Sequence, residues 1–108
     1  ADIEVEGNFE TRRIWGYPWK FYEIDRTITR EEIIEAVESS RDLDELEDII
    51  GEPNGVNESL REVAYEIEPD GNEPRYAVIT YDYYENLVGD IQIAGETQEY
   101  SEWIDIER

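Results

Sequence analysis

The chain has 108 residues, enough for one domain with a single core, and 39% of them are hydrophobic, which indicates a folded protein rather than a disordered acidic chain. Its 30 Asp and Glu against 9 Lys and Arg give a formal net charge of −21, so we expect positively charged partners and no direct binding to nucleic acid or to membranes. The absence of His and Cys excludes disulfides, thiolate and imidazole metal sites, and the nucleophile systems that depend on either residue.

The N-terminal part of the sequence predicts β-hairpins. A strand around Ile3, a turn at 7–8 and a second strand over 9–15 form the first of them. The stretch 16–18 ends in a proline, which cannot donate a hydrogen bond to a neighbouring strand. We therefore expect a break there and a third short strand over 19–25.

Aromatic residues are concentrated between residues 14 and 25. Trp15, Tyr17, Trp19 and Phe21 alternate along the chain and would share one side of an extended segment. We expect these side chains to close the core between the sheet and the helices. A second hypothesis makes Trp15 and Tyr17 an exposed aromatic anchor of a protein interface.

The first helix is predicted by its N-terminal signals. Thr29 and Glu32 have the spacing of a capping box, and Ile28 and Ile33 occupy the positions of a hydrophobic staple. A helix is therefore expected to begin at Arg30 and to end at the following pair of serines.

A second helix is predicted directly after the first. Asp42 and Glu45 repeat the capping-box spacing, and Gly51 followed by Pro53 is typical of a helix end. The apolar stripe of this helix consists of Leu43, Leu46, Ile49 and Ile50.

The C-terminal half predicts an antiparallel meander. Residues 60–67 fit either a helix or a strand, but the turn-forming stretch 68–74 and the β-branched and aromatic stretch 75–84 favour a hairpin. A further strand is expected over 87–95. Residues 99–107 fit a strand or a helix, and we favour the strand.

The predicted fold is α+β: a single small domain over residues 1–108, with N-terminal β-hairpins, two short helices and a C-terminal antiparallel β-meander packed on the helices. No signal-peptide pattern and no apolar run long enough to span a membrane is visible, so we expect a soluble, intracellular protein. Whether a leader was removed before Ala1, and whether the protein forms homo-oligomers, stays open.

Few kinds of chemistry are compatible with this sequence. The glycines form neither a G-x-G-x-x-G nor a G-K-[ST] pattern, so no phosphate-binding loop is expected. Residues 41–48 lack the glycine and the distal glutamate of an EF-hand loop. We predict no enzyme activity, no catalytic residue, no metal site and no cofactor.

The negative charge is concentrated in the predicted helices. Residues 29–50 contain nine acidic and two basic residues, a net charge of −7, whereas residues 1–28 have a net charge of −2. The acidic side chains expected to point away from the apolar stripes, here called the acidic helical face, are Glu31, Glu35, Glu38, Asp44, Glu47 and Asp48.

Two functions fit this charge distribution. In the first, the acidic helical face imitates the phosphates of DNA and occupies the basic site of a nucleic-acid-binding protein. Small phage-encoded anti-restriction and anti-CRISPR proteins are similar to this chain in composition.

In the second, the acidic residues keep a structural, subunit or virion protein hydrated in concentrated salt, where charge repulsion is screened within about 3 Å. The excess of Arg over a single lysine, Lys20, resembles proteins of extreme halophiles.

Overall fold

The computed structural model describes residues 9–106, which form one seven-stranded antiparallel sheet and two helices. In chain order the elements are β1 (Phe9–Ile14), β2 (Tyr17–Tyr22), α2 (Arg30–Ser39), α3 (Leu43–Ile50), β3 (Gly55–Asn57), β4 (Glu62–Asp70), β5 (Glu73–Tyr81), β6 (Val88–Ala94) and β7 (Ser101–Ile104). The strands have the same order in the sheet as in the chain, and each pairs with its sequence neighbours. The predicted α+β class and the C-terminal meander are confirmed, although strands outweigh helices.

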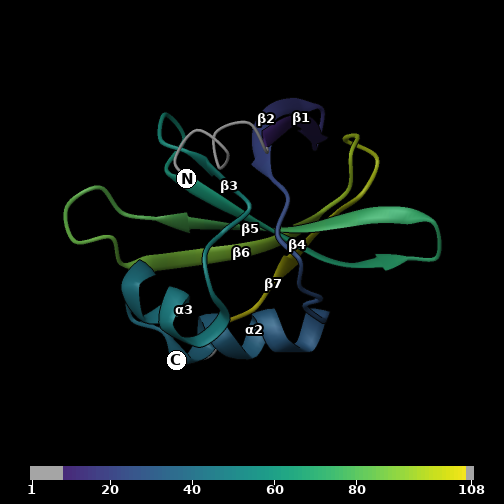
Figure 1. The fold of residues 1–108 in the computed structure, drawn as a ribbon. Helices are drawn as coiled ribbons and strands as arrows, with labels where there is room; N and C mark the ends of the chain where they lie inside the picture. The colour runs from purple at the N-terminus through teal and green to yellow at the C-terminus, as the bar shows by residue number, and fades with distance from the viewer. Residues whose placement is uncertain (1–8, 107–108) are drawn as a thin grey trace.

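Both faces of the sheet are covered, by different elements. Helices α2 and α3 lie across one face, and the β1–β2 hairpin lies on the opposite side of the sheet (Figure 1). The helix-side core contains Ile33, Val37, Leu46, Val63, Tyr65, Ile79, Ile91 and Ile93, among others. The second core contains Ile14, Trp19, Phe21, Ala64, Tyr76, Val78 and Ala94.

The buried aromatic residues of β2 lie on the face that carries no helix. Trp19 and Phe21 are buried, but they pack against Tyr76 and other residues of the second core, so the expectation that they close the core against the helices is wrong. Side chains alternate between the two faces of β4 and β5, and the two short helices cover only one face. The apolar side chains on the other face are buried by the hairpin instead.

The turn of this hairpin differs from the prediction. β2 begins at Tyr17 rather than at residue 19, and the two-residue turn is Trp15-Gly16, with φ angles of 54° and 86°. Two positive φ angles are typical of a type I′ turn, which normally contains Asn or Gly, so a tryptophan gave no turn signal. Pro18 is accommodated inside β2 because β3 pairs with β2 only at Phe21, beyond the position of the missing N–H group.

The two segments that fit either a strand or a helix form strands. β4 and β7 confirm that 60–67 and 99–107 contain strands. The predicted strand around Ile3 and the turn at 7–8 lie outside the described residues.

Helix α2 begins at Arg30, as its capping box predicts. The Oγ1 atom of Thr29 accepts a hydrogen bond from the backbone N–H of Glu32 at 3.1 Å, and the Glu32 carboxylate accepts one from the N–H of Thr29 at 2.8 Å. Ile28 and Ile33 are both buried in the helix-side core. Local sequence therefore fixes the start of this helix.

Helix α3 is confirmed with two differences. The Asp42 carboxylate accepts from the N–H of Glu45 at 3.0 Å, but the Glu45 carboxylate accepts from the N–H of Arg41 instead of closing the box on Asp42. Ile49, predicted in the apolar stripe, is exposed, whereas Leu46 is fully buried and Leu43 and Ile50 are half-buried. Neither α2 nor α3, the helices of the described part, is long and apolar enough to cross a membrane.

The cap of α2 gives a first testable prediction. Thr29→Ala removes the hydroxyl acceptor of the capping box, and we expect the free energy of unfolding to fall by about 1 kcal/mol. Urea denaturation followed by circular dichroism measures this change. Thr27→Ala, two residues earlier and exposed, is the control and should stay within about 0.3 kcal/mol of the parent protein.

Candidate functional site

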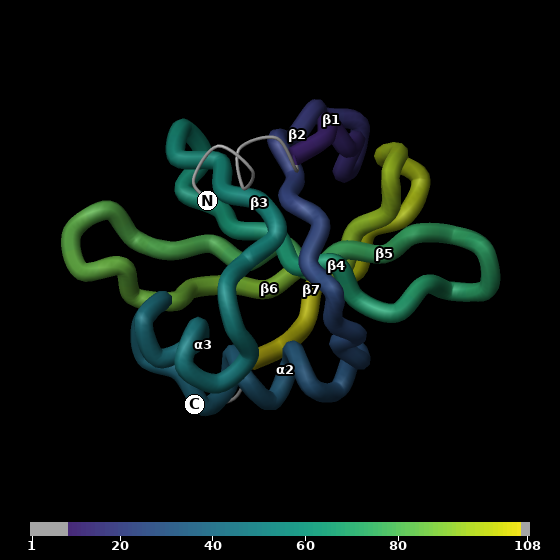
Figure 2. Tube along the Cα trace, viewed as in Figure 1, coloured from purple at the N-terminus to yellow at the C-terminus, as the bar shows by residue number. Residues whose placement is uncertain are grey.

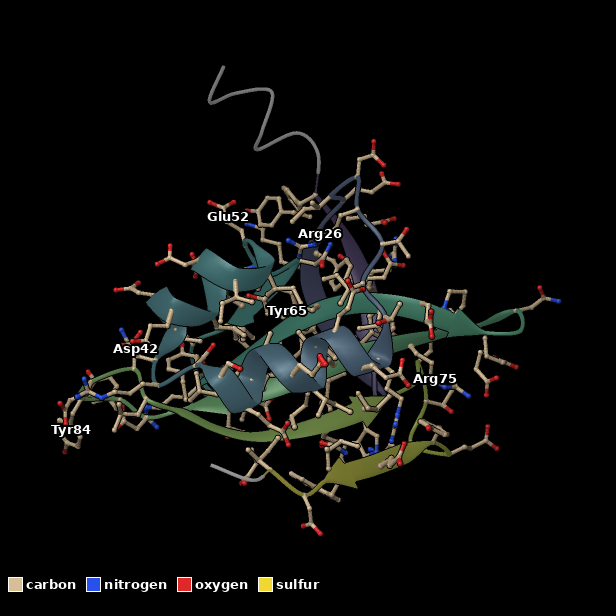
Figure 3. The ribbon with its side chains drawn as sticks, turned by 90° about the horizontal axis from the view of Figure 1, so that it is seen from below. Arg26, Asp42, Glu52, Tyr65, Arg75 and Tyr84 are labelled. Atoms are coloured by element: carbon tan, nitrogen blue, oxygen red, sulfur yellow. The ribbon has the colours of Figure 1, made fainter. Side chains whose placement is uncertain are left out.

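The acidic helical face occupies the outer side of the helical layer. Glu31, Glu35 and Glu38 are separated by four and three residues on α2, which places them along one side of this helix. Asp44, Glu47 and Asp48 have the same kind of spacing on α3. All are exposed except Glu38, which is half-buried. Seen from the helix side, carboxylates project outward from the helices and from the surrounding loops (Figure 3).

Most of these carboxylates have no ion-pair partner among residues 9–106. Ion pairs in this part of the chain include those of Arg12 with Glu10 and Glu66, of Arg30 with Glu102, and of Arg75 with Asp70. None of them includes Glu31, Glu35, Asp44, Glu47 or Asp48. The negative charge of this surface is therefore largely uncompensated by the described residues.

Negative charges crowd around Glu47. Glu47 is exposed, but desolvation by neighbouring atoms raises the pKa of its carboxyl group, and the nearby negative charges of Glu52, Asp44 and Asp48 raise this pKa further. A raised carboxyl pKa means that the ionised form is unfavourable in this place. A positive charge brought against α3 would relieve both the repulsion and the pKa shift.

The density of charge differs between the two helices. The carboxylates of α2 extend from Glu31 to Glu38, about 10 Å along the helix axis, and those of α3 extend from Asp44 to Asp48, about 6 Å. B-DNA carries one negative charge per roughly 1.7 Å of its axis. Helix α3 therefore comes closer than α2 to the charge density of DNA.

The helix-free face of the sheet contains an aromatic pocket. It is a cavity of about 450 Å³ between the β1–β2 hairpin and the strands β4 to β7. Its walls include Trp15, Tyr17, Trp19, Leu60, Glu62, Val78, Gln92, Ser101 and Trp103. All three tryptophans of the chain therefore line this one cavity.

The turn of the first hairpin closes one end of the pocket. The backbone N–H of Trp15 donates to the carbonyl oxygen of Gly95 at 2.7 Å, and that of Gly16 donates to the carbonyl oxygen of Glu96 at 2.8 Å. Figure 2 shows the hairpin and the loop between β6 and β7 on the same side of the sheet. These two hydrogen bonds hold Trp15 at a φ of 54°, a conformation that costs energy for a bulky residue.

Some polar groups of the pocket have hydrogen-bond partners and others have none among the described residues. The amide nitrogen of Gln92 and the hydroxyl of Ser101 are hydrogen-bonded to each other. The buried indole N–H of Trp15 has no acceptor among residues 9–106. Glu62 is half-buried, has neither a hydrogen bond nor an ion pair from its carboxylate in the same part of the chain, and has its pKa raised by burial.

The predicted aromatic anchor lies at the rim of this pocket. The rings of Trp15 and Tyr17 are stacked, with centroids 6.0 Å apart and an angle of 30° between their planes. Tyr17 is 50% exposed and Trp15 is half-buried. The structure thus places these two residues in one pocket with Glu62 and Trp103, for which the sequence contains no signal because their proximity depends on the pairing of distant strands.

No group of three or more acidic side chains within residues 9–106 is placed to hold a metal ion. Comparisons of the chain with protein-family models, with curated proteins and with solved structures found no match.

Proposed function

We propose that the protein is a non-enzymatic binding module whose acidic helical face occupies the basic site of a nucleic-acid-binding protein, such as a nuclease or a repressor, and inhibits it by imitating DNA. The observation that carries this proposal is the crowding of Asp44, Glu47, Asp48 and Glu52 on and just after α3: desolvation raises the pKa of Glu47 most, and the negative charges of the other three raise it further. Such repulsion costs stability in the free protein and is offset when a positive surface binds.

The position of the charges on packed helices supports the same proposal. Ile33 and Val37 of α2 and Leu46 of α3 are fully buried, so the helices that carry the carboxylates are anchored on the sheet. Charges held in place before binding lose less conformational entropy than charges on a flexible chain. Release of counterions from both surfaces then drives association, which makes the affinity strongly dependent on salt.

A charge-reversal experiment tests this proposal. The variant Asp44→Lys/Glu47→Lys/Asp48→Lys replaces three attractive contacts by repulsive ones. We expect it to need an about 100-fold or more higher concentration than the parent protein to displace a fluorescent DNA duplex from a purified nuclease or repressor. Fluorescence anisotropy of the duplex at several salt concentrations measures the displacement. The parent protein should displace less DNA as the salt concentration rises.

A second triple variant separates a specific surface from overall charge. Glu73, Glu85 and Asp90 are exposed acids outside the helices, and their replacement by lysine changes the net charge by the same amount. We expect this control to keep most of the displacement activity. Equal losses in the two triple variants, or no displacement from any tested nuclease or repressor, would contradict recognition through α3.

A second candidate function is salt adaptation of a structural or subunit protein. It is favoured by exposed carboxylates that lie outside the helices, including Glu58, Glu73, Glu85, Asp90, Glu96 and Glu99. Such a coat keeps a protein hydrated at molar salt. Circular dichroism distinguishes the two functions: a fold that forms only at molar salt supports adaptation, whereas a fold that is stable in dilute buffer supports mimicry.

A further inference from the structure

The side chains that line the aromatic pocket are of the kind that binds organic cations. Trp15, Trp19, Trp103 and Tyr17 contribute aromatic rings, and indole rings attract cations most strongly. Trp103 is 66% exposed although it is among the largest apolar side chains of the chain. A ligand that covers this ring would therefore bury apolar surface in addition to making a cation–π contact.

Glu62 gives the pocket a negative charge that has no counterpart in the described residues. It is the one charged side chain among the lining residues, and its carboxylate takes part in no hydrogen bond or ion pair within residues 9–106. The adjacent Arg61 is not its partner, because the Arg61 guanidinium lies 4.4 Å from the ring centre of Tyr83. A half-buried carboxylate without a cation is unfavourable, and a bound cation would remove this cost.

A carboxylate and an aromatic ring with a guanidinium bound to both occur together at Glu66, elsewhere on the same strand. Glu66 stands four residues after Glu62 on β4, and both side chains point to the helix-free face because side chains alternate. The Glu66 carboxylate binds Nη1 of Arg12 at 3.1 Å, and the Arg12 guanidinium lies 4.9 Å from the ring centre of Phe21. Carboxylate, guanidinium and aromatic ring are thus combined at Glu66, whereas at Glu62 the carboxylate and the rings are present without a guanidinium.

We propose that the aromatic pocket binds the side chain of an arginine from a peptide segment of a partner protein, with the guanidinium paired to Glu62 and covered by the tryptophan rings. A guanidinium is planar, stacks on aromatic rings and forms two parallel hydrogen bonds with a carboxylate. A volume of about 450 Å³ has room for the whole side chain, including its methylene groups. This site lies on the face opposite the helices, so it stands independently of the acidic helical face.

Tryptophan fluorescence provides a selective measurement, because all three tryptophans line the pocket. The probe is a capped tripeptide, acetyl-Gly-Arg-Gly-amide, and the matched control is the same peptide with citrulline, which has nearly the shape of arginine but no charge. We expect saturable fluorescence changes with a Kd on the order of 1 mM for the arginine peptide, and at least tenfold weaker binding of the citrulline peptide.

Three variants and one pH series connect the binding to named residues. Glu62→Gln removes the charge with little change of shape and should weaken binding at least tenfold, whereas Glu85→Gln, at an exposed position outside the pocket, should change binding less than about twofold. Trp103→Leu replaces an exposed ring, should not disturb folding, and should also weaken binding. Affinity should fall as the pH is lowered through the raised pKa of Glu62, because the protonated carboxyl has no charge to pair.

Three results would overturn the proposal. These are the absence of a saturable change up to about 10 mM arginine peptide, equal binding of the citrulline peptide, and unchanged affinity of the folded Glu62→Gln variant. A trimethyllysine peptide that binds more tightly than the arginine peptide would also overturn the assignment to a guanidinium, since a quaternary ammonium group donates no hydrogen bond to Glu62.

Discussion

Phe21→Ala is expected to lower the free energy of unfolding by about 3–5 kcal/mol, the usual cost of truncating a buried phenylalanine. Phe21 is 0% exposed and belongs to the second core, where its ring and the Tyr76 ring pack edge to face with centroids 5.4 Å apart. The same ring lies under the Arg12 guanidinium. Truncation would therefore leave a cavity and also remove the ring on which the half-buried Arg12 guanidinium rests.

Chemical denaturation followed by circular dichroism measures this loss, and Phe9→Ala is the matched control. Phe9 belongs to the same hairpin but is exposed, so its truncation should cost less than about 1 kcal/mol. A loss of less than about 1.5 kcal/mol for Phe21→Ala would mean that the hairpin contributes little to the stability of the sheet, contrary to the second core described above.

Asn54→Ala is expected to lower the free energy of unfolding by about 3 kcal/mol, because several buried polar groups lose their partner at once. Asn54 is only 1% exposed. Its Nδ2 atom donates to the carbonyl oxygen of Tyr22 at 2.9 Å, and its Oδ1 atom accepts from the N–H of Glu66 at 2.9 Å and from Nη2 of Arg26 at 3.2 Å. The side chain thus joins β2 to β4 just before the short strand β3.

Thermal and urea denaturation measure the effect, with Asn72→Ala as the control. Asn72 is exposed in the turn between β4 and β5, and its replacement should stay within about 0.5 kcal/mol of the parent protein. If Asn54→Ala were equally mild, water molecules would have to replace all of the lost hydrogen bonds, and the side chain would not be the link between the two strands.

The parts of the fold that the sequence predicted well depend on neighbouring residues. The start of α2 at Arg30 follows from Thr29 and Glu32, which bond to each other within one helical turn. The end of α3 follows from Gly51, whose φ of 95° favours glycine. For residues 60–67, which fit a helix or a strand, the turn-forming residues that follow them favour the strand. Each of these features is encoded within a few residues.

The parts that were missed depend on contacts between distant segments. Trp15 adopts a positive φ because its N–H reaches Gly95, 80 residues later in the chain, and no local pattern contains this information. Two separate cores require the sheet to be covered on both faces, which the alternation in β4 and β5 alone does not reveal.

The two candidate surfaces also differ in whether neighbouring residues or distant segments determine them. The acidic helical face could be selected from helical spacing alone. The aromatic pocket could be selected only in part, because Glu62 and Trp103 join Trp15 and Tyr17 through the pairing of β4, β5, β6 and β7.

The meander also determines the order in which the molecule can assemble. From β3 to β7 every strand pairs with the next one in the chain, so these pairings close short loops and have a low contact order, which favours rapid folding. Two backbone connections of the first hairpin span long stretches of sequence: the pairing of Phe21 with Gly55, and the bonds of the Trp15-Gly16 turn to the loop after β6. The loop-closure entropy of these connections places the docking of the first hairpin late on the folding pathway. The arginine-sized pocket beneath that hairpin would then form only after the strands of the meander have paired, and local opening of the hairpin would expose it.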